Sequence, residues 1–188
     1  MTNVIIVHGF NDPRSGADNV DRLIPYIKRK GYNTVEVDYG WRGLIGVRIC
    51  NDSTARNLLK LYKRGDIVIG YSNGCSIVAR AIEMGLPVDH VIFIHPALHA
   101  DWEPPTDRLN RKIYVYHSRE DWTTKMAGGI RKYSPLNFIF GKTKWGQMGT
   151  IGSTSTHPSL INIKDGYDHF DGFKESPEGY IETIQTKS

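Results

Sequence analysis

Short runs rich in Val and Ile alternate along the chain with segments whose apolar residues recur every three or four positions. The runs predict strands at residues 3–7, 34–39, 66–70, 90–94, 112–117 and 160–163. The segments between them predict amphipathic helices; the first reaches Gly31 with a kink at Pro25, and the last begins at Ser176 and Pro177. This alternation predicts an α/β class protein: a three-layer, doubly wound fold around a mainly parallel six-stranded sheet.

The same alternation continues from one end of the chain to the other. We find no internal repeat, no low-complexity tract and no linker-like stretch in the 188 residues. A chain of this length with 39% hydrophobic residues can bury one substantial core. The sequence therefore predicts a single domain over residues 1–188.

Charge, apolar runs and cysteines narrow the function classes. The net charge is +4, and the basic clusters at 28–30 and 62–64 fall at predicted helix ends, where they favour the helix dipole, so we predict no nucleic-acid partner. No stretch reaches the roughly 18 apolar residues of a membrane span. The first residues resemble a strand and not a signal peptide, and the two cysteines form no disulfide framework, so we expect a cytoplasmic protein.

Ligands of a doubly wound sheet bind beyond the carboxyl ends of its strands. The chemistry-bearing residues that follow the predicted strands are His8, Ser72, His95, Glu120, Asp121 and His169. After the first strand the chain reads HGFNDPRSG and lacks a Gly-rich phosphate loop, which argues against a nucleotide or flavin binder. We therefore predict no cofactor.

Residues 70–74 read Gly-Tyr-Ser-Asn-Gly, between a predicted strand and a predicted helix. One interpretation is a simple turn. The other is a nucleophile on a strained strand-to-helix elbow, where side chains in place of Gly70 and Gly74 would collide with neighbouring backbone. A serine needs a base and an orienting carboxylate, and the chain supplies Ser72, Asp121 and His169 in that order.

Four local matches give the chain a resemblance to the α/β-hydrolase family over nearly its whole length: VHGF at 7–10, GYSNG at 70–74, YHSREDWT at 116–123 and GYDHF at 166–170. The resemblance implies a minimal α/β-hydrolase fold with Ser72 as nucleophile, His169 as general base and acid, and Asp121 as orienting acid. It also implies an oxyanion hole formed by the backbone N–H groups of Phe10 and Asn73.

Two assignments have rivals in the sequence. Glu120 competes with Asp121 for the acid, and His157 competes with His169, although His157 precedes its strand and so falls at the other end of the sheet. His95 and His99 have the i, i+4 spacing of metal ligands, but Pro96 makes a helix there doubtful. We predict no metal site.

Two leading strands of larger family members are missing, and the segment after residue 94 has no room for a helical cap. Residues 133–158 are aromatic and longer than a connection needs to be, so they either cover the site or pack on the sheet edge. The side chains we expect to bind substrate are His95, Trp102, Trp145 and Met148.

The resemblance implies a serine hydrolase that cleaves a small to medium carboxylic ester or thioester through an acyl-enzyme. The partner would then be a small-molecule ester. A peptidase or an acyltransferase would use the same triad. The alternative from another class is a binding protein of this fold with a vestigial triad.

Overall fold

The structure is a computed structural model, which describes residues 2–10, 19–40, 44–105, 111–126 and 145–186. Within the helix that begins at Leu44, side chains are described from residue 50 onward.

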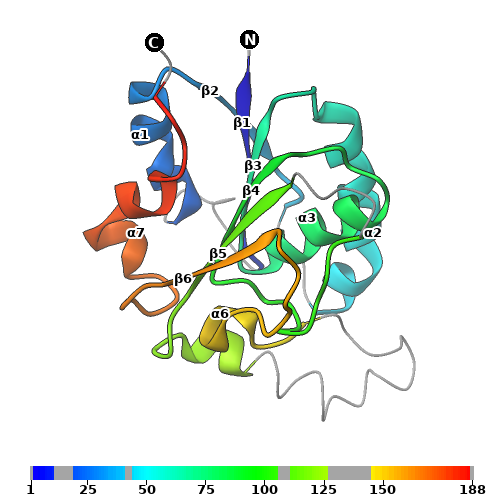
Figure 1. Cartoon of the computed structure of the whole chain (residues 1–188). Coiled ribbons are helices and arrows are strands. Elements are labelled where there is room, and N and C mark those ends of the chain that lie inside the picture. The colour runs from blue at the N-terminus through cyan, green and yellow to red at the C-terminus, as the bar shows by residue number, and fades with distance from the viewer. Residues whose placement is uncertain (1, 11–18, 41–43, 106–110, 127–144, 187–188) are drawn as a thin grey trace.

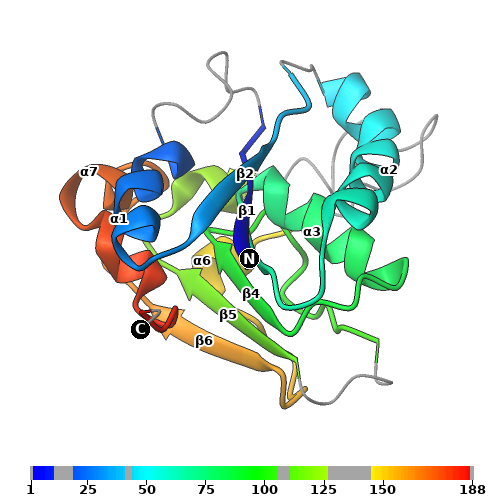
Figure 2. The same cartoon turned by 90° about the horizontal axis from the view of Figure 1, so that it is seen from above.

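Six strands form one sheet in the order β2–β1–β3–β4–β5–β6, and every neighbouring pair is parallel (Figure 2). The strands are β1 (Asn3–Val7), β2 (Asn33–Val37), β3 (Ile67–Tyr71), β4 (His90–Ile94), β5 (Lys112–His117) and β6 (Leu160–Lys164). All six predicted strands are present, with bounds within two residues of the predicted ones. The predicted parallel six-stranded sheet is confirmed.

Helices cover both faces of this sheet (Figure 1). α1 (Ile24–Arg29) and α7 (Gly172–Glu175) lie on one face, and α2 (Leu44–Leu61) and α3 (Asn73–Glu83) lie on the other. Each interface has its own apolar cluster, one including Leu58, Ile77 and Phe93, the other including Leu23 and Phe173. Because parallel strands must be covered on both faces, this arrangement explains the continuous apolar runs and confirms the three layers.

The first helical segment differs from the prediction. A 3₁₀ turn, η1 (Val20–Leu23), comes first, and the Asn19 side chain accepts the backbone N–H of Val20 at 2.6 Å. Pro25 lies in the first turn of α1, where a missing N–H removes no helix hydrogen bond. It therefore begins the helix and does not kink it; the earlier part of the predicted helix, residues 11–18, lies outside the described residues.

The predicted C-terminal helix also takes another form. Pro177 begins a 3₁₀ segment, η2 (Pro177–Ile181), and the short helix α7 precedes it. α6 (Met148–Ile151) is a further single-turn helix before β6.

The connections after β1 and β3 leave in opposite directions, toward β2 and β4 respectively, although β1 and β3 are neighbours. Such a switch point opens a crevice at the carboxyl ends of the two strands. Phe10 follows β1 and Ser72 follows β3, so the fold brings both to this crevice.

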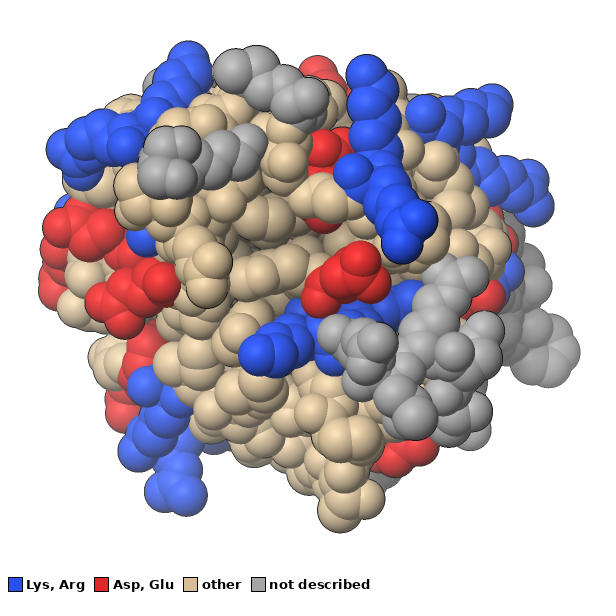
Figure 3. Space-filling model, turned by 45° about the horizontal axis from the view of Figure 1, so that its top comes forward, with Lys and Arg blue, Asp and Glu red and all other residues tan. Residues whose placement is uncertain are grey.

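Across the part of the chain that the structure describes, no helix is both long enough and apolar enough to span a membrane. On the face shown in Figure 3, acidic side chains lie among the basic ones, so the basic residues of that face do not form a continuous patch.

Candidate active site

Ser72 lies at the junction of β3 and α3 with φ 51° and ψ −116°, a conformation that L residues rarely adopt. Its backbone N–H donates to the carbonyl of Ile94 (3.0 Å), and its own carbonyl accepts N–H groups from Cys75 and Ala97 (3.1 Å each). These three bonds hold the strained residue in place. The strand–serine–helix geometry is that of a nucleophile elbow.

The glycines around Ser72 are required by close backbone approach, as the sequence predicted. A Cβ on Gly70 would lie 2.9 Å from the backbone nitrogen of Cys75, and a Cβ on Gly74 would collide with the carbonyl groups of Val7 and His8. A Cβ on Gly9 would lie 3.3 Å from the Cβ of Ser72. The end of β1 is therefore packed directly against the elbow.

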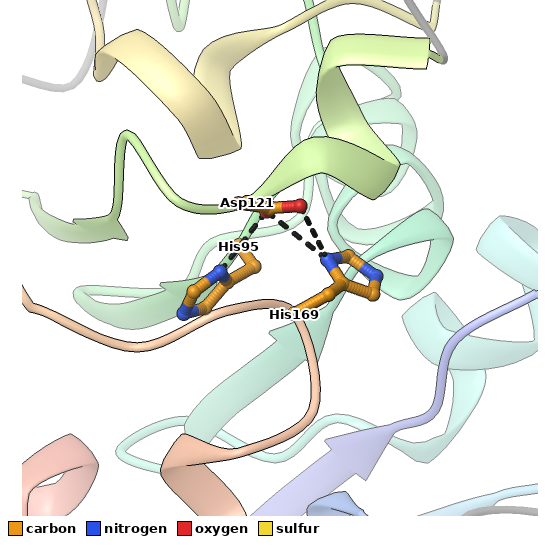
Figure 4. A group of neighbouring side chains, drawn as sticks. All are labelled: His95, Asp121 and His169. Carbon is orange, nitrogen blue, oxygen red and sulfur yellow. Dashed lines mark hydrogen bonds and ion pairs between the residues drawn. The ribbon is translucent and has the colours of Figure 1, made fainter.

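His169 and Asp121 form a buried hydrogen-bonded pair (Figure 4). The Nδ1 atom of His169 lies 3.0 Å from each carboxylate oxygen of Asp121. The Tyr71 hydroxyl donates to the carbonyl of His169 at 2.9 Å, and the two rings lie 5.0 Å apart. Because Tyr71 precedes Ser72, this contact brings the His169 loop alongside the elbow.

Between the two candidate acids, the structure brings Asp121 to the histidine. Asp121 is fully buried, whereas Glu120 is exposed and directs only its backbone N–H to the Ser118 hydroxyl (3.2 Å). Burial opposes ionisation of Asp121, but hydrogen bonds from His169 and His95 outweigh it and hold the pKa of this carboxyl below its usual range. Asp121 is thus an anion at neutral pH.

His157 lies away from this carboxylate. It precedes β6, and its Nδ1 accepts the backbone N–H of Ser159 at 3.2 Å. Ser159 in turn pairs with Ile113 near the start of β5, whereas Asp121 follows the end of that strand. The structure therefore places His157 at the amino ends of the strands, as its position in the sequence indicated.

His95 shares Asp121 with His169, an arrangement that the sequence analysis missed. Its Nδ1 lies 3.0 Å from Asp121, and its Nε2 lies 3.1 Å from Asp165 and 3.2 Å from the Tyr180 hydroxyl. We expected His95 to contact substrate, but its side chain is fully buried (0% exposed) against the carboxylate of Asp121. The only feature of the sequence that pointed to His95 was its position directly after the strand that became β4.

The two candidate oxyanion-hole residues are connected through Tyr39. Phe10 follows β1 and Asn73 is the first residue of α3. The Tyr39 hydroxyl donates to the carbonyl of Gly9 at 2.7 Å, and the Asn73 side chain donates to that hydroxyl at 3.3 Å. Asn51 completes the set by exchanging side-chain hydrogen bonds with Asn73 (3.1 and 3.3 Å). Neither Tyr39 nor Asn51 was singled out from the sequence.

Trp145 is the one expected substrate contact that lies beside the elbow. Its indole N–H donates to the Asn73 side chain at 2.8 Å, and its ring meets Phe10 edge-on at 5.3 Å. Trp145 is buried and also packs with Ala97, so the structure places it against the start of α3 and against Phe10.

The other two aromatic and apolar candidates lie elsewhere. The indole N–H of Trp102 donates to the carboxylate of Glu83, the last residue of α3. The Trp102 ring lies 5.9 Å from the ring of Phe93. At about 1.5 Å per residue, the end of α3 is about 15 Å from its start. Met148 is fully buried in the core on the α2 and α3 side. The structure therefore places Trp102, which is partly buried, at the far end of α3 from Ser72, and Met148 inside the core.

The segment 133–158 is described only from residue 145 onward, and its earlier part lies outside the described residues. From there it runs along the connection that follows β4: Met148 donates to the Leu98 carbonyl (3.0 Å), Gly149 to that of Pro96 (2.8 Å) and Thr154 to that of Ala100 (2.7 Å). From Met148 onward this stretch therefore packs along that connection.

Large apolar side chains flank the His169–Asp121 pair on the surface. Trp122 follows Asp121 and is 66% exposed, and Met126 lies four residues further on. Phe170 follows His169, is 50% exposed, and its ring lies 5.1 Å from the imidazole. The exposed Phe170 ring therefore gives the His169 side of the pair an apolar surface, whereas Asp121 has polar contacts with His95 and Thr124.

His95, Asp121 and His169 each offer one metal-ligand atom, and these atoms lie within 4.8 Å of one another. A metal ion there would need both Nδ1 atoms without protons, whereas each lies at hydrogen-bonding distance from Asp121. A hydrogen-bonded network thus accounts for the distances. His99, which has the i, i+4 spacing to His95 in the sequence, lies beside Asp101 (3.7 Å).

No protein-family model and no curated protein matches this sequence. Solved structures do match. A protein from Xanthomonas campestris assigned to the α/β superfamily of hydrolases is 16% identical with a TM-score of 0.63, and the match covers 100% of both chains.

A Bacillus licheniformis lipase is 14% identical with a TM-score of 0.60, over 99% of this chain and 92% of the lipase. A Pyrococcus furiosus esterase is 13% identical with a TM-score of 0.60, over 97% of this chain and 80% of the esterase. These likenesses show that the chain has the α/β-hydrolase fold.

Proposed function

We propose that the protein is a serine hydrolase that cleaves a small to medium carboxylic ester or thioester through an acyl-enzyme. The observation that carries the proposal is the strained backbone of Ser72 (φ 51°) between β3 and α3, with the His169–Asp121 pair next to Tyr71. Strain of this kind persists only where the surroundings enforce it, and it lifts the serine hydroxyl above the sheet. The named activities of the lipase and esterase of the same fold support the proposal.

In this reaction Asp121 accepts the Nδ1–H of His169, which leaves Nε2 to take the proton of Ser72. The Ser72 oxygen attacks the carbonyl carbon, and the resulting oxyanion accepts the backbone N–H groups of Asn73 and Phe10. The N-terminal dipole of α3 adds to this stabilisation. His169 then protonates the leaving alcohol or thiol, and water releases the acyl group by the same steps. No step needs a cofactor.

The apolar flank of the site favours an apolar acyl group. Phe170 exposes its ring 5.1 Å from the imidazole of His169, and Trp122 and Met126 expose large side chains in the segment that follows Asp121. Each methylene group that such side chains remove from water contributes about 0.8 kcal/mol, or roughly fourfold in kcat/KM. Esters with a short apolar chain are therefore better substrates on this proposal than acetyl esters.

A fluorophosphonate probe, which reacts with activated serines, tests the nucleophile. We expect the wild-type protein to be labelled and to hydrolyse activated acyl esters, and we expect Ser72→Ala to lose both properties while remaining folded. Ser76→Ala is the matched control. Like Ser72, Ser76 is a buried serine, but it lies within α3 and its hydroxyl donates to the Ala97 carbonyl (2.9 Å). Labelling of Ser72→Ala would reject the assignment, and an unlabelled wild-type protein would favour the binding protein.

A further inference from the structure

His95 lies between two carboxylates. Its Nδ1 is 3.0 Å from Asp121 and its Nε2 is 3.1 Å from Asp165. An ionised carboxylate only accepts hydrogen bonds, and a neutral imidazole carries only one N–H. One ring nitrogen of a neutral His95 would therefore direct a lone pair at a carboxylate oxygen. A protonated ring donates to both carboxylates and removes this conflict.

Three further titratable groups of the described residues lie around His95. The Tyr180 hydroxyl lies 3.2 Å from Nε2, the His169 ring is edge-on at 5.8 Å, and His117 interacts with His95 as a like charge. Burial alone would lower the pKa of His95, but hydrogen bonds to Asp121 and Asp165 raise it to about 9. Burial and nearby Asp165 also raise the pKa of Tyr180, which keeps this hydroxyl neutral.

We infer that His95 is a positioning residue that is protonated in the working enzyme and shares the carboxylate of Asp121 with His169. The catalytic part of this inference rests on the proposed hydrolase function. Asp121 receives N–H donors from His95, His169 and the backbone of Thr124, each at 3.0 Å. These three donors fix the orientation of the carboxylate, and hence of the base (Figure 4).

The separate effects on kcat and KM test this role. His95→Gln disturbs one of the three donors that orient Asp121, so we expect kcat to fall about tenfold while KM changes little, because a displaced base slows the reaction without weakening substrate binding. The control is His90→Gln, at the opposite end of β4, where the ring contacts Thr183 at 3.3 Å. An unchanged kcat, or a loss confined to KM, would overturn the inference.

Nitrogen NMR of the histidine rings gives a readout that does not depend on activity. At pH 7.5 we expect the His95 ring to carry a proton on each nitrogen. That signal should be absent in His95→Gln and present in His90→Gln. If His95→Gln does not fold, Asp165→Asn should convert the signal to that of a neutral ring. A neutral His95 in the wild-type protein at pH 7.5 would overturn the inference, whereas an intact imidazolium signal with no labelling at Ser72 would reject only the hydrolase proposal.

Discussion

Ser72 and His95 are the two non-glycine residues with positive φ in the part of the chain that the structure describes (51° and 46°). Each directly follows one of two neighbouring strands, and each is held by a backbone bond to the next strand: Ser72 to Ile94, and His95 to Tyr116 (3.0 Å each). Such conformations cost of order 1–3 kcal/mol each. The strain is concentrated at the carboxyl edge of the sheet, where the candidate catalytic residues meet.

At this scale the structure predicts which carboxylate matters. Asp121→Asn should reduce kcat by about 10⁴-fold, because an amide in place of the carboxylate no longer fixes the His169 tautomer. Glu120→Gln should retain nearly full activity, since the Glu120 side chain is exposed. Steady-state rates on one activated ester compare the two variants. A large loss of rate in Glu120→Gln, together with a nearly unchanged rate in Asp121→Asn, would show that the wrong acid has been assigned.

At the scale of elements, the site depends on how closely α3 approaches the end of β1. Gly74, in the first turn of α3, lies against the carbonyl groups of Val7 and His8, and Gly9 lies against Tyr71 and Ser72. These contacts bring the candidate oxyanion donors of the two segments to the same side of Ser72. Tyr39, two residues beyond β2, connects them by its hydroxyl. On the proposed mechanism, the oxyanion hole therefore depends on the packing of three elements.

Gly74→Ala tests this packing. The added methyl would collide with the carbonyls of Val7 and His8, so we expect α3 to shift, activity to fall, and stability to fall by about 1–3 kcal/mol, or several degrees in Tm. Gly166→Ala is the control for stability, because a Cβ there meets no atom within 4 Å. Thermal unfolding of the two variants gives the comparison; equal Tm values would show that the elbow has room for a side chain.

At the scale of the whole molecule, the buried polar network joins segments that are far apart in the chain. His95 follows β4, Asp121 follows β5, Asp165 and His169 follow β6, and Tyr180 lies in η2. The network couples these segments, because each of its bonds is buried or partly buried and losing one partner would leave a charged group unpaired.

This network predicts how stability depends on pH. The pKa of His95 is about 9 in the folded protein and 6.5 ordinarily, so the folded state holds an extra proton between these values. The resulting stability is fully present below about pH 6.5 and is lost as the pH rises through 9; it amounts to about 3 kcal/mol at most. Urea unfolding at pH 6, 7.5 and 9 should show this decrease in the wild type and not in His95→Gln. Parallel decreases in both proteins would contradict it.

The sequence by itself determined the class of fold and the identity of the three triad candidates. Continuous apolar runs, glycines at helix ends and the elbow motif are local signals, because each depends on residues within a few positions of one another. Parallel strands place their carboxyl ends at one edge, so the residues after each strand could be grouped from the strand order alone. This reasoning found Ser72, Asp121 and His169, and it also brought His95 to the same edge.

Only the tertiary structure decided what the grouped side chains contact. His95 meets Asp121 across 26 residues and Asp165 across 70, and Trp145 meets Asn73 across 72. Such contacts depend on the paths of the connections and on which side chains the core accepts, and hydrophobic periodicity encodes neither. The same physics placed Met148 in the core and packed the partly buried Trp102 against it, since burial of large apolar surface is worth more than its exposure at the site. The shared carboxylate of Asp121 could therefore be seen only once the six strands were packed together.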